Sequence, residues 1–536
     1  MKAFGTAFLK GEVQALRWLS NHLNNPEQRR AVLAQARSKK CSPALIDALR
    51  TQHQDVLTPS REAHLKALEE GDAAVVVTGQ QVGLFLGPLY TIHKAATAIA
   101  LAKALSKESG HPVVPLFWLQ TEDHDTAEIA TSFHPRHHDE PLALAISYDP
   151  DTRHSVEHIQ LGDELLDLHR QLNESMGHLP YAEETLSWWQ KAYKPGRSMS
   201  DAFAHMLMKI FEDEGLLVLN PRTNALAALA APIHRQCLEQ AHTINELLIE
   251  RESALQEAGF RVQIPIRKEC SLPFFHPDGV EGPRYRLELR EDGFGLSGRP
   301  DAFFSKAFIF ETLSHAPMQF STSALMRPLL QDILLPTAAY VGGPGEISYF
   351  AQLDPLYKQL GQRMPMIVPR ARFTHIEPSI SRTLESLSLT SQDLSLPERE
   401  IAKRYTEQEG SRLSDEALKA NLYEPFARAL NNFKDEILAL EPGFEKTVQK
   451  TYGQVERIVD KLSGKIQNVR FHQDSQRMKQ VKDAQQTLFP FGKPQERVYA
   501  LPYFLALFGV QAFKERLFDA IGETFPWDTE HQELQW

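Results

Sequence analysis

Polar side chains are concentrated just after the apolar run Ala73–Thr78, in the stretch VVVTGQQVGLFLGPLYTIHK. They are Gln80, Gln81, His93 and Lys94, and Gly83 lies between the two pairs. The glycines do not follow the G-x-G-x-x-G spacing of dinucleotide sites, but they allow a ligand close to the backbone, and a helix start favours an anion. The stretch predicts a substrate-binding turn with His93 as a catalytic group; a tight turn with polar capping is the alternative.

A second polar group, TEDHD at 121–125, directly follows the apolar run around Phe117. Acids that flank a histidine can bind a divalent metal, act as a general base or hold a substrate ammonium. We predict that Asp123 and His124 are catalytic and that Asp125 binds substrate. We assign no metal ligand, although the histidines of HPRHHD, at 134, 137 and 138, could complete a zinc site and make a metal hydrolase a further alternative.

Two more polar groups occur farther along the chain. In ALMRPLLQDILLPTAAYVGGPGEISYFAQL, the predicted substrate-binding residues are Arg327, Gln331, Gly343, Gly345, Glu346 and Tyr349. The turn Gly-Gly-Pro-Gly can direct backbone amides at a ligand, and a carboxylate beside it can bind a cation, an amine or a ribose hydroxyl. In MPMIVPRARFTHIEP, Arg370, Arg372 and His375 could hold a phosphate or a carboxylate, or could be solvated charges.

Short apolar runs alternate with helical patterns, which indicates βαβ units and a parallel sheet. The runs are AAVVVTGQQ, HPVVPLFWLQ, GLLVLNP and TAAYVGG, and Ala96–Ser109 and Met199–Glu214 are predicted helices. Ligands bind beyond the carboxyl ends of the strands in such sheets. The polar groups described above follow these runs, so we expect them to meet at one edge of the sheet.

The predicted fold class is α/β: a Rossmann-type parallel-sheet core with inserted connecting subdomains, followed by a C-terminal helical domain. We place a helical lead-in at 1–70, the core at 71–378 and the C-terminal domain at 379–536. The insertions fall at about 140–200 and 255–320, where alternating residues and a glycine-rich turn predict antiparallel strands. Ser386–Glu398 has the composition of a linker.

The C-terminal domain contains a heptad pattern on both sides of Pro442–Gly443. The seam residues are Phe426, Leu430, Phe433, Ile437 and Leu440, then Val448, Tyr452, Val455, Val459, Leu462, Ile466 and Val469. Four-and-three spacing interrupted by a tight turn predicts an antiparallel coiled-coil hairpin. Such an arm either packs on its own domain or pairs with a second chain, and the heptad pattern leaves both open.

Composition narrows the function class. The net charge of −11 disfavours nucleic-acid binding. The mean hydropathy of −0.35 disfavours a membrane protein. The N-terminus lacks the pattern of a signal peptide. Cys41, Cys237 and Cys270 are far apart and lack C-x-x-C spacing, which is typical of a protein in the reducing cytoplasm.

The motifs VVVTGQQVGLFLGPLYTIHK, PLFWLQTEDHD, RPLLQDILLPTAAYVGGPGEISYFAQL, MPMIVPRARF and LFPFGKPQER resemble, in this order, the cysteine ligases of bacillithiol biosynthesis. The resemblance spans nearly the whole chain. It implies a core related to class I aminoacyl-tRNA synthetases and a dimerising coiled coil. It also implies amide formation between L-cysteine and glucosaminyl-malate as the last step of the pathway. Class I synthetases carry His-Ile-Gly-His and Lys-Met-Ser-Lys-Ser, whereas this chain has PLYTIHK in place of the first motif and lacks the second. ATP or another nucleotide is a possible cofactor, but no intact lysine motif supports it.

With this reaction in view, we expect the cysteine carboxylate to be activated near His93 and Lys94. Asp123 or Asp125 would hold the cysteine ammonium, and His124 would take a proton from the attacking amine. Arg327 would bind the malyl carboxylates, because a guanidinium matches a carboxylate with two parallel hydrogen bonds. The alternative from another class is a non-catalytic dimeric scaffold or ligand-binding protein of the same pathway, with a degenerate nucleotide site.

Overall fold

The computed structural model describes the chain except residues 126–128, 138, 149–152, 398–399, 402–403, 405–412, 474 and 529. The described residues form two compact units. The first comprises Met1–His134, Ala143–Phe373 and Tyr499–Gln532, and the second comprises Pro135–Leu142, Thr374–Val498 and Glu533–Trp536.

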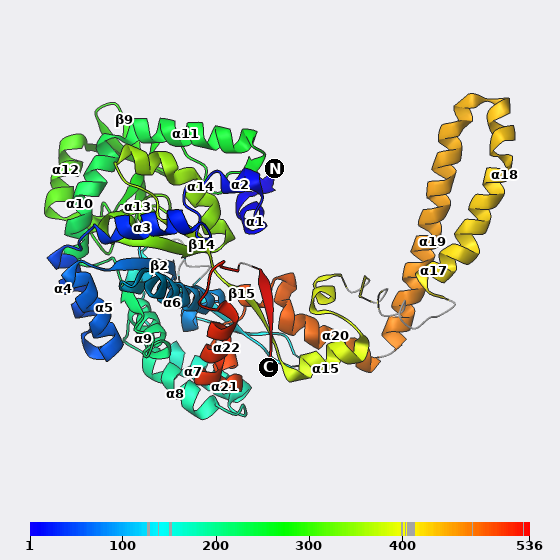
Figure 1. Ribbon diagram of the computed structural model, residues 1–536, viewed down its shortest axis with the longest axis horizontal. Coiled ribbons are helices and arrows are strands. Elements are labelled where there is room, and N and C mark those ends of the chain that lie inside the picture. The colour runs from blue at the N-terminus through cyan, green and yellow to red at the C-terminus, as the bar shows by residue number, and fades with distance from the viewer. Residues whose placement is uncertain are drawn as a thin grey trace. The chain divides into compact units, whose positions relative to one another are not determined.

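A five-stranded sheet with strand order β14-β13-β2-β3-β6 forms the centre of the first unit (Figure 1). The strands are β2 (Ala74–Gln81), β3 (Val113–Gln120), β6 (Leu217–Leu219), β13 (Thr337–Gly342) and β14 (Met366–Pro369). All four neighbouring pairs run parallel, as the alternating pattern predicts. Their carboxyl ends therefore share one edge of the sheet.

Both faces of this sheet are buried, which is why its strands read as continuous apolar runs. Val75 and Val77 of β2 pack into one apolar cluster, and Ala74 and Val76 pack into another on the opposite face. Neighbouring side chains of a strand point to opposite faces, so the two clusters are the two layers of helices around the sheet. The parallel core predicted from the sequence is confirmed.

Helices cover the sheet and fill the lead-in. The helices of the first unit are α1 (Phe4–Leu9), α2 (Val13–Leu16), α3 (Pro26–Arg37), α4 (Pro43–His53), α5 (Pro59–Glu70), α6 (Tyr90–Ser109), α7 (Glu164–Met176), α8 (Ala182–Ala192), α9 (Met199–Ile210), α10 (Asn224–Glu239), α11 (Ala241–Glu257), α12 (Lys306–His315), α13 (Met326–Leu334), α14 (Pro344–Gln359), α21 (Pro502–Phe508) and α22 (Val510–Ile521). Local signals explain several starts: Asn25, Ser42 and Thr58 cap α3, α4 and α5, each followed by proline.

The segments at 140–200 and 255–320 have different structures. The first carries the helices α7 and α8, and the second carries most of a sheet with strand order β11-β10-β9-β8-β12. Its strands are β8 (Cys270–Phe275), β9 (Tyr285–Arg290), β10 (Gly293–Leu296), β11 (Arg299–Ser305) and β12 (Phe320–Ser321), paired antiparallel throughout. Short strands pair elsewhere: β1 (Lys2–Ala3) with β7 (Phe260–Arg261), and β4 (Thr131–His134) with β5 (Leu142–Ala145).

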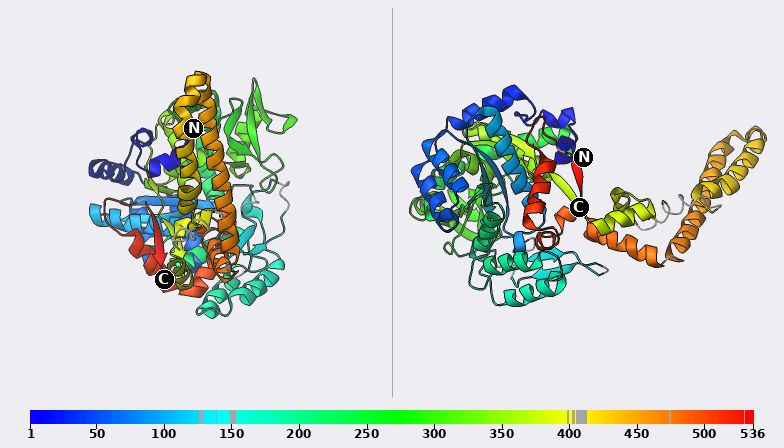
Figure 2. Two further views of the ribbon diagram at one scale, coloured as in Figure 1. Left: turned by 90° about the vertical axis from the view of Figure 1, so that its right-hand side faces the viewer. Right: turned by 60° about the horizontal axis from the view of Figure 1, so that its bottom comes forward.

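The second unit contains a long helical hairpin. Its helices are α15 (Pro378–Leu387), α17 (Asp415–Leu418), α18 (Glu424–Leu440), α19 (Glu445–Gln473) and α20 (Ser475–Leu488). A two-stranded sheet joins β15 (Arg372–Ile376) and β16 (His531–Gln535). In all views, α18 and α19 run side by side, in yellow and orange, with a turn at Pro442–Phe444 (Figures 1 and 2). The antiparallel hairpin predicted from the heptads is confirmed.

The hairpin seam is only partly buried. Val448 and Val459 of the seam are buried, whereas Phe433 and Leu440 of the seam are 59% and 81% exposed. Ile458, next to the seam residue Val459 on α19, is 65% exposed. Helix α18 has no buried residue. A stripe of large apolar side chains thus remains on the outside of the hairpin.

The linker predicted from the composition of Ser386–Glu398 is wrong for the part that the structure describes. Leu389 and Leu394 are buried in an apolar cluster with Val481 and Leu488 of α20. Thr390 and Asp393 form a capping box around a short 3-10 helix. The alternating leucines, which the polar composition concealed, fold this segment onto α20.

No helix among the described residues is both long enough and apolar enough to cross a membrane.

Candidate active site at the strand ends

The adjacent glutamines at the end of β2 contact two different groups of charged residues. Gln80 Oε1 accepts a hydrogen bond from Lys94 Nζ at 2.8 Å, and its Nε2 donates to Tyr90 Oη at 3.3 Å. Gln81 Nε2 donates to Asp123 Oδ2 at 2.7 Å. Because neighbouring strand residues point to opposite faces, one glutamine serves each side of the strand end. We name the two groups the lysine cluster and the aspartate cluster.

The lysine cluster consists of Lys94, Glu346, Tyr340, Arg327, Tyr349 and Arg370. Lys94 Nζ donates to Gly79 O at 2.8 Å and to Gln80, and it lies 2.5 Å from Glu346 Oε2. Three acceptors around one nitrogen match the three N–H groups of an ammonium. Burial lowers the pKa of Lys94, and Glu346 opposes that shift.

Glu346 lies in the first turn of α14, directly after the sequence Gly-Gly-Pro-Gly. Its Oε2 accepts from the Gly343 N–H at 2.8 Å, and its Oε1 accepts from Tyr340 Oη at 2.6 Å. Burial alone would raise the pKa of Glu346, but Lys94 and the Gly343 N–H outweigh burial and lower it. Glu346 is therefore a carboxylate paired with the Lys94 ammonium.

Arg327 and Gln331 extend the cluster along α13. Arg327 donates to Gln331 Oε1 at 2.9 Å, to Tyr349 Oη at 3.0 Å and to Tyr340 Oη at 3.2 Å. Gln331 Nε2 in turn donates to Asp332 Oδ1 at 2.8 Å. Burial, only partly offset by the Arg327 charge, raises the pKa of Tyr349 to about 12, so its phenol is neutral at pH 7.

Arg370 lies at the end of β14 and completes this cluster. Its backbone N–H donates to Gly342 O at 2.9 Å. Its guanidinium lies 5.5 Å from the Tyr90 ring centroid, and its side chain is buried. The cationic side chains Lys94, Arg327 and Arg370 outnumber the carboxylate of Glu346 within the cluster. A buried group with excess positive charge is suited to an anionic ligand such as a carboxylate or a phosphate.

The aspartate cluster consists of Gln81, Asp123, His124 and Arg284. Asp123 Oδ1 accepts a hydrogen bond from the backbone N–H of His124 at 2.7 Å and lies 3.8 Å from Arg284 Nη2. Burial raises the pKa of Asp123, but Arg284, Gln81 and the His124 N–H together lower it. Asp123 is thus held as an anion at the end of β3.

Arg284 comes from the antiparallel inserted sheet, just before β9. Its Nη1 donates to the Glu122 carbonyl oxygen, its side chain is only 6% exposed, and its guanidinium lies 4.2 Å from the Phe274 ring centroid. Thr322, just after β12, donates from its N–H to Glu122 Oε2 at 3.0 Å. The inserted sheet therefore fixes the TEDHD segment from one side.

His124 is the titratable neighbour of Asp123. Its Nδ1 lies 3.7 Å from Asp123 Oδ1 and has no hydrogen-bond partner among the described residues. Burial lowers the pKa of His124, and the Arg284 charge lowers it further. A neutral imidazole beside a carboxylate can accept a proton, which is the property of a general base.

The glycine turn between β2 and α6 is buried rather than open. The Leu84 N–H donates to Ile129 O at 2.9 Å, the Gly87 N–H to Leu84 O at 3.0 Å, and the Leu89 N–H to Tyr499 O at 2.8 Å. A Cβ at Gly83 would lie 3.1 Å from Gly87 Cα, so the two glycines pack against each other. These amides are occupied by the protein itself, which favours the alternative of a tight turn.

The remaining predicted residues lie in contrasting places. His93 is fully buried with its ring edge-on to Phe373 at 5.1 Å, whereas Asp125 and Gly345 are exposed. Of the basic group at 370–375, Arg370 joins the lysine cluster, while His375 packs its ring 5.9 Å from Trp536 in the second unit.

The histidines of HPRHHD do not extend the aspartate cluster within the described residues. His134 is buried and bonds Ser132 Oγ at 2.8 Å, and His137 lies between Glu377 and Asp483 of the second unit. His138 lies outside the described residues. In the part of the chain that the structure describes, no group of three or more histidine, cysteine, aspartate or glutamate side chains could hold a metal.

Sequence comparison places this chain in a known family. Residues 2–371 match the N-terminal Rossmann-like domain of bacillithiol biosynthesis BshC, and residues 373–536 match its C-terminal coiled-coil domain. The chain belongs to the BshC family.

Other members of the BshC family align over most of this chain. The protein of Salinibacter ruber, named "Putative cysteine ligase BshC", is 33% identical over 491 residues, which covers 90% of this chain and 87% of that protein. The protein of the same name from Solibacter usitatus is 31% identical, with coverage of 89% and 87%. Thermus thermophilus arginyl-tRNA synthetase covers 88% of this chain at 10% identity, but with a TM-score of 0.17 this likeness supports no argument.

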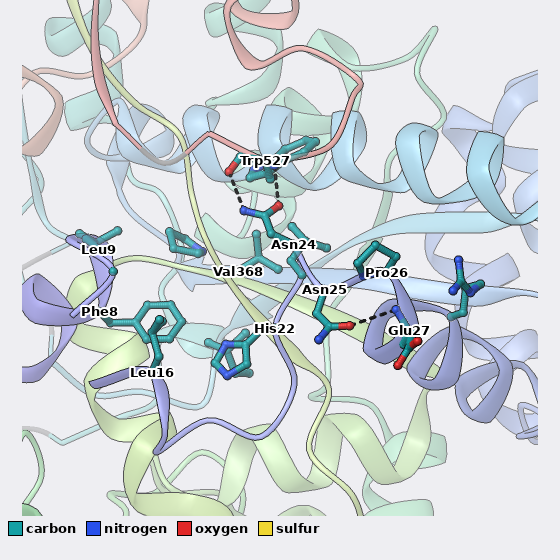
Figure 3. Close-up of a pocket in the computed structure, with 15 residues that line it drawn as sticks. Phe8, Leu9, Leu16, His22, Asn24, Asn25, Pro26, Glu27, Val368 and Trp527 are labelled. Atoms are coloured by element: carbon teal, nitrogen blue, oxygen red, sulfur yellow. Dashed lines mark hydrogen bonds between the residues drawn. The ribbon is translucent and has the colours of Figure 1, made fainter. Parts of the chain in front are cut away.

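This member of the BshC family also has a cavity of about 770 Å³ at the edge of the sheet, where β14 meets the lead-in and Trp527 (Figure 3). Two of its polar side chains already bond the protein. Asn24 exchanges two hydrogen bonds with the Trp527 backbone, and Asn25 Oδ1 accepts from the Glu27 N–H. None of the site residues predicted from the sequence lines this cavity.

Sequence reasoning missed Arg284, Tyr340 and Thr322. Tyr340 stands inside the quoted motif YVGGPGE, so its place at a strand end could have revealed it. Arg284 and Thr322 flank strands of the inserted sheet, and no local signal indicates that this sheet packs on the TEDHD segment. Only the tertiary structure brings them to Asp123 and Glu122.

Proposed function

We propose that this protein is the ligase that joins L-cysteine to glucosaminyl-malate through an amide bond, as the last step of bacillithiol biosynthesis. The observation that carries the proposal is that two polar clusters lie at the end of β2, one with excess positive charge and one built around the Asp123 carboxylate. Gln80 contacts the cationic lysine cluster, and Gln81 contacts the anionic Asp123. The names of the BshC relatives support the same reaction.

The two clusters complement a free amino acid. L-cysteine at neutral pH carries a carboxylate and an ammonium on one carbon, so it needs a cation and an anion close together. In our proposal, the carboxylate lies beside the positive charges of Lys94 and Arg370, and Asp123 pairs with the ammonium. Cations beside the carboxylate also stabilise the negative charge that develops on its oxygens when an amine attacks.

Amide formation from a free carboxylate requires activation, which a phosphoryl or adenylyl donor supplies. ATP or another nucleotide is the donor class that we propose, and the excess positive charge of the lysine cluster suits its phosphates. His124, as a neutral base, would take the proton from the attacking sugar amine. We propose that Arg327 binds the malyl carboxylates of the acceptor, and that His93 supports the activated carboxylate from the first turns of α6.

We propose that the protein acts as a cytoplasmic homodimer. The apolar stripe on the hairpin, which includes Phe433, Leu440 and Ile458, supports a second copy as the partner, because exposed apolar stripes on paired helices are typical of helix association. Cys41, Cys237 and Cys270 are all free thiols, which is in keeping with a reducing compartment.

The reaction is tested with the purified protein, L-cysteine, glucosaminyl-malate and a series of nucleotides, with the thiol product measured by mass spectrometry. Product formed without any other protein supports the ligase. A non-catalytic scaffold or ligand-binding protein would bind substrate but form no product under any nucleotide. Substrate binding without product under any nucleotide, together with product formation once a second protein is added, would overturn the proposal.

A further inference from the structure

The turn that joins β2 to α6 has an uncommon backbone conformation. Phe85 has φ 51° and ψ 42°, and Leu86 has φ 69°, so two consecutive residues with side chains lie in the left-handed region. This region is costly for residues other than glycine and persists only where surrounding groups fix it. Both side chains are fully buried. The conformation must therefore be held by what packs against it.

Tyr193, directly after α8 in the first inserted segment, supplies the polar contacts. Its Oη accepts a hydrogen bond from the Leu86 N–H at 3.0 Å and donates to the Gly83 carbonyl oxygen at 3.4 Å. One hydroxyl thus ties two points of the strained turn. Tyr193 is itself fixed, because His169 Nε2 of α7 donates to its carbonyl oxygen at 2.6 Å.

Aromatic side chains of the same insertion enclose Phe85. The ring centroid of Phe85 lies 5.0 Å from that of Tyr193, 5.7 Å from His169 and 6.0 Å from Trp189. Such offset and edge-on contacts favour one ring position. The inserted segment thus contributes both polar and apolar contacts to the turn.

The turn lies between the residues of the proposed site. Gln80 and Gln81 precede it at the end of β2, and His93 and Lys94 follow it on α6. The position of Lys94 relative to Gln80 therefore depends on the turn, whereas Asp123 reaches the site through β3. A change in the turn would displace Lys94 and His93 but leave Asp123 in place.

We propose that Tyr193 is a positioning residue for the reaction: its hydroxyl fixes the turn at 83–87 and so holds Lys94 against Gln80 and Glu346. The inserted helices α7 and α8 then have a direct role in the site, although none of their side chains is among the residues of the two clusters. This inference rests on the proposed function, because it assumes that the strand ends carry the chemistry.

Tyr193→Phe tests the inference, since it removes the hydroxyl and keeps the ring. Hydrogen exchange followed by mass spectrometry should show about 10-fold faster exchange of the amides from 83 to 93, with 74–79 unchanged. Tyr181→Phe is the matched control, because Tyr181 begins the same inserted helix and is about half exposed. Wild-type exchange at 83–93 in Tyr193→Phe would overturn the inference, whatever the activity.

Kinetics separate positioning from loss of folded protein. Wild type and Tyr193→Phe are both assayed well below their thermal midpoints. Tyr193→Phe should lower kcat by about 10-fold. It should change the KM for cysteine by less than about 3-fold, because Asp123 is unaffected. An equal kcat in both proteins would contradict the inference. If wild-type protein forms no product, the proposed function fails, and the exchange result still decides the role of Tyr193.

His169→Gln, which frees the Tyr193 backbone, gives a second variant with the same expected exchange.

Discussion

Gln81 Nε2 donates a hydrogen bond to Asp123 Oδ2 at 2.7 Å, which joins the carboxyl ends of β2 and β3. One oxygen of Asp123 therefore faces the glutamine, while Oδ1 faces the His124 N–H and the Arg284 guanidinium. The carboxylate is oriented by three donors from three segments of the chain. This orientation leads to the first prediction.

Asp123→Asn should weaken cysteine binding. The amide keeps the size of the side chain and can still accept from Gln81, but it cannot pair with an ammonium. A hydrogen bond to a charged group contributes about 1.5–3 kcal/mol, so the KM for cysteine should rise about 10- to 100-fold. Isothermal calorimetry with cysteine alone measures the same change without turnover.

Asp354→Asn is the control, because Asp354 lies on α14 and pairs with the exposed Lys358. It should leave cysteine binding unchanged. Equal cysteine affinity in wild type and Asp123→Asn would exclude Asp123 as the group that holds the ammonium.

Removing the charge of Lys94 should destabilise the protein. Lys94→Met leaves the Glu346 carboxylate buried without its partner, and breaking a buried pair costs about 3–5 kcal/mol. Lys94→Met/Glu346→Gln should cost clearly less than the sum of the two single changes, because no unpaired charge remains. Urea unfolding gives the three free energies.

A matched pair on the surface provides the comparison. Lys358→Met breaks an exposed i,i+4 pair with Asp354 on the same α14 and should cost less than about 0.5 kcal/mol. Additive effects of Lys94→Met and Glu346→Gln would show that the two groups do not interact in solution.

Much of the strand-end site follows from the sequence because parallel sheets have a simple rule. The valines of β2 and the apolar run of β3 indicate buried strands, and their ends must lie at one edge. That rule brings Gln81 near Asp123, and it brings together the starts of α6 and α14, which carry Lys94 and Glu346; the two pairs are 42 and 252 positions apart in the chain. Periodicity also predicted α18 and α19, since a repeated apolar seam has no other common fold.

What the sequence could not indicate depends on contacts between distant segments. Arg284 reads as one of several arginines around β9, and only the docking of the inserted sheet brings it to Asp123. The glycines of VVVTGQQVGLFLGPLYTIHK suggested open amides, but Gly83 packs on Gly87 and the neighbouring amides bond the protein. Local pattern does not distinguish a glycine that admits a ligand from one that admits another backbone.

The hairpin should carry the dimer. Ile458→Lys and Phe433→Lys place a charge on the exposed apolar stripe, where a partner helix would bury it at high cost. Light scattering after size exclusion should report a dimer for the wild type and a monomer for either variant. Leu57→Lys, an exposed apolar position in the first unit, is the control and should stay dimeric. A monomeric wild type would contradict the dimer.

His137→Gln should loosen the segment at 135–142 from the rest of the second unit. His137 Nε2 lies 3.3 Å from Glu377 Oε2 and its Nδ1 lies 3.6 Å from Asp483 Oδ2, and these carboxylates raise the pKa of His137 to about 10. The imidazolium thus stabilises the unit fully below pH 6.5, and this contribution is lost as the pH rises through about 10. Trypsin at pH 7.5 should cut after Arg136 faster in His137→Gln than in His111→Gln. Equal cutting rates would show that His137 does not hold the segment.

His53 should make the first unit sensitive to acid. Its Nδ1–H donates to Leu49 O at 2.7 Å and its Nε2 accepts from the Val218 N–H at 3.0 Å, so only the neutral ring fits. Burial lowers the pKa of His53 from 6.5 to about 4. The stabilising contribution of the neutral ring is therefore complete above pH 6.5 and is lost as the pH falls toward 4, at about 1.4 kcal/mol per pH unit.

Between pH 6.5 and pH 5, this histidine alone should lower the free energy of unfolding by about 2 kcal/mol. His53→Gln keeps an acceptor for the Val218 N–H and cannot be protonated, so its loss of stability over this interval should be smaller by that amount. Urea unfolding at pH 6.5, 6 and 5 gives the slope for each protein. His178→Gln, at an exposed position, should keep the wild-type slope. If His53→Gln also keeps the wild-type slope, the protonation of His53 does not change between the folded and the unfolded protein. Its buried hydrogen bonds then do not set the acid sensitivity.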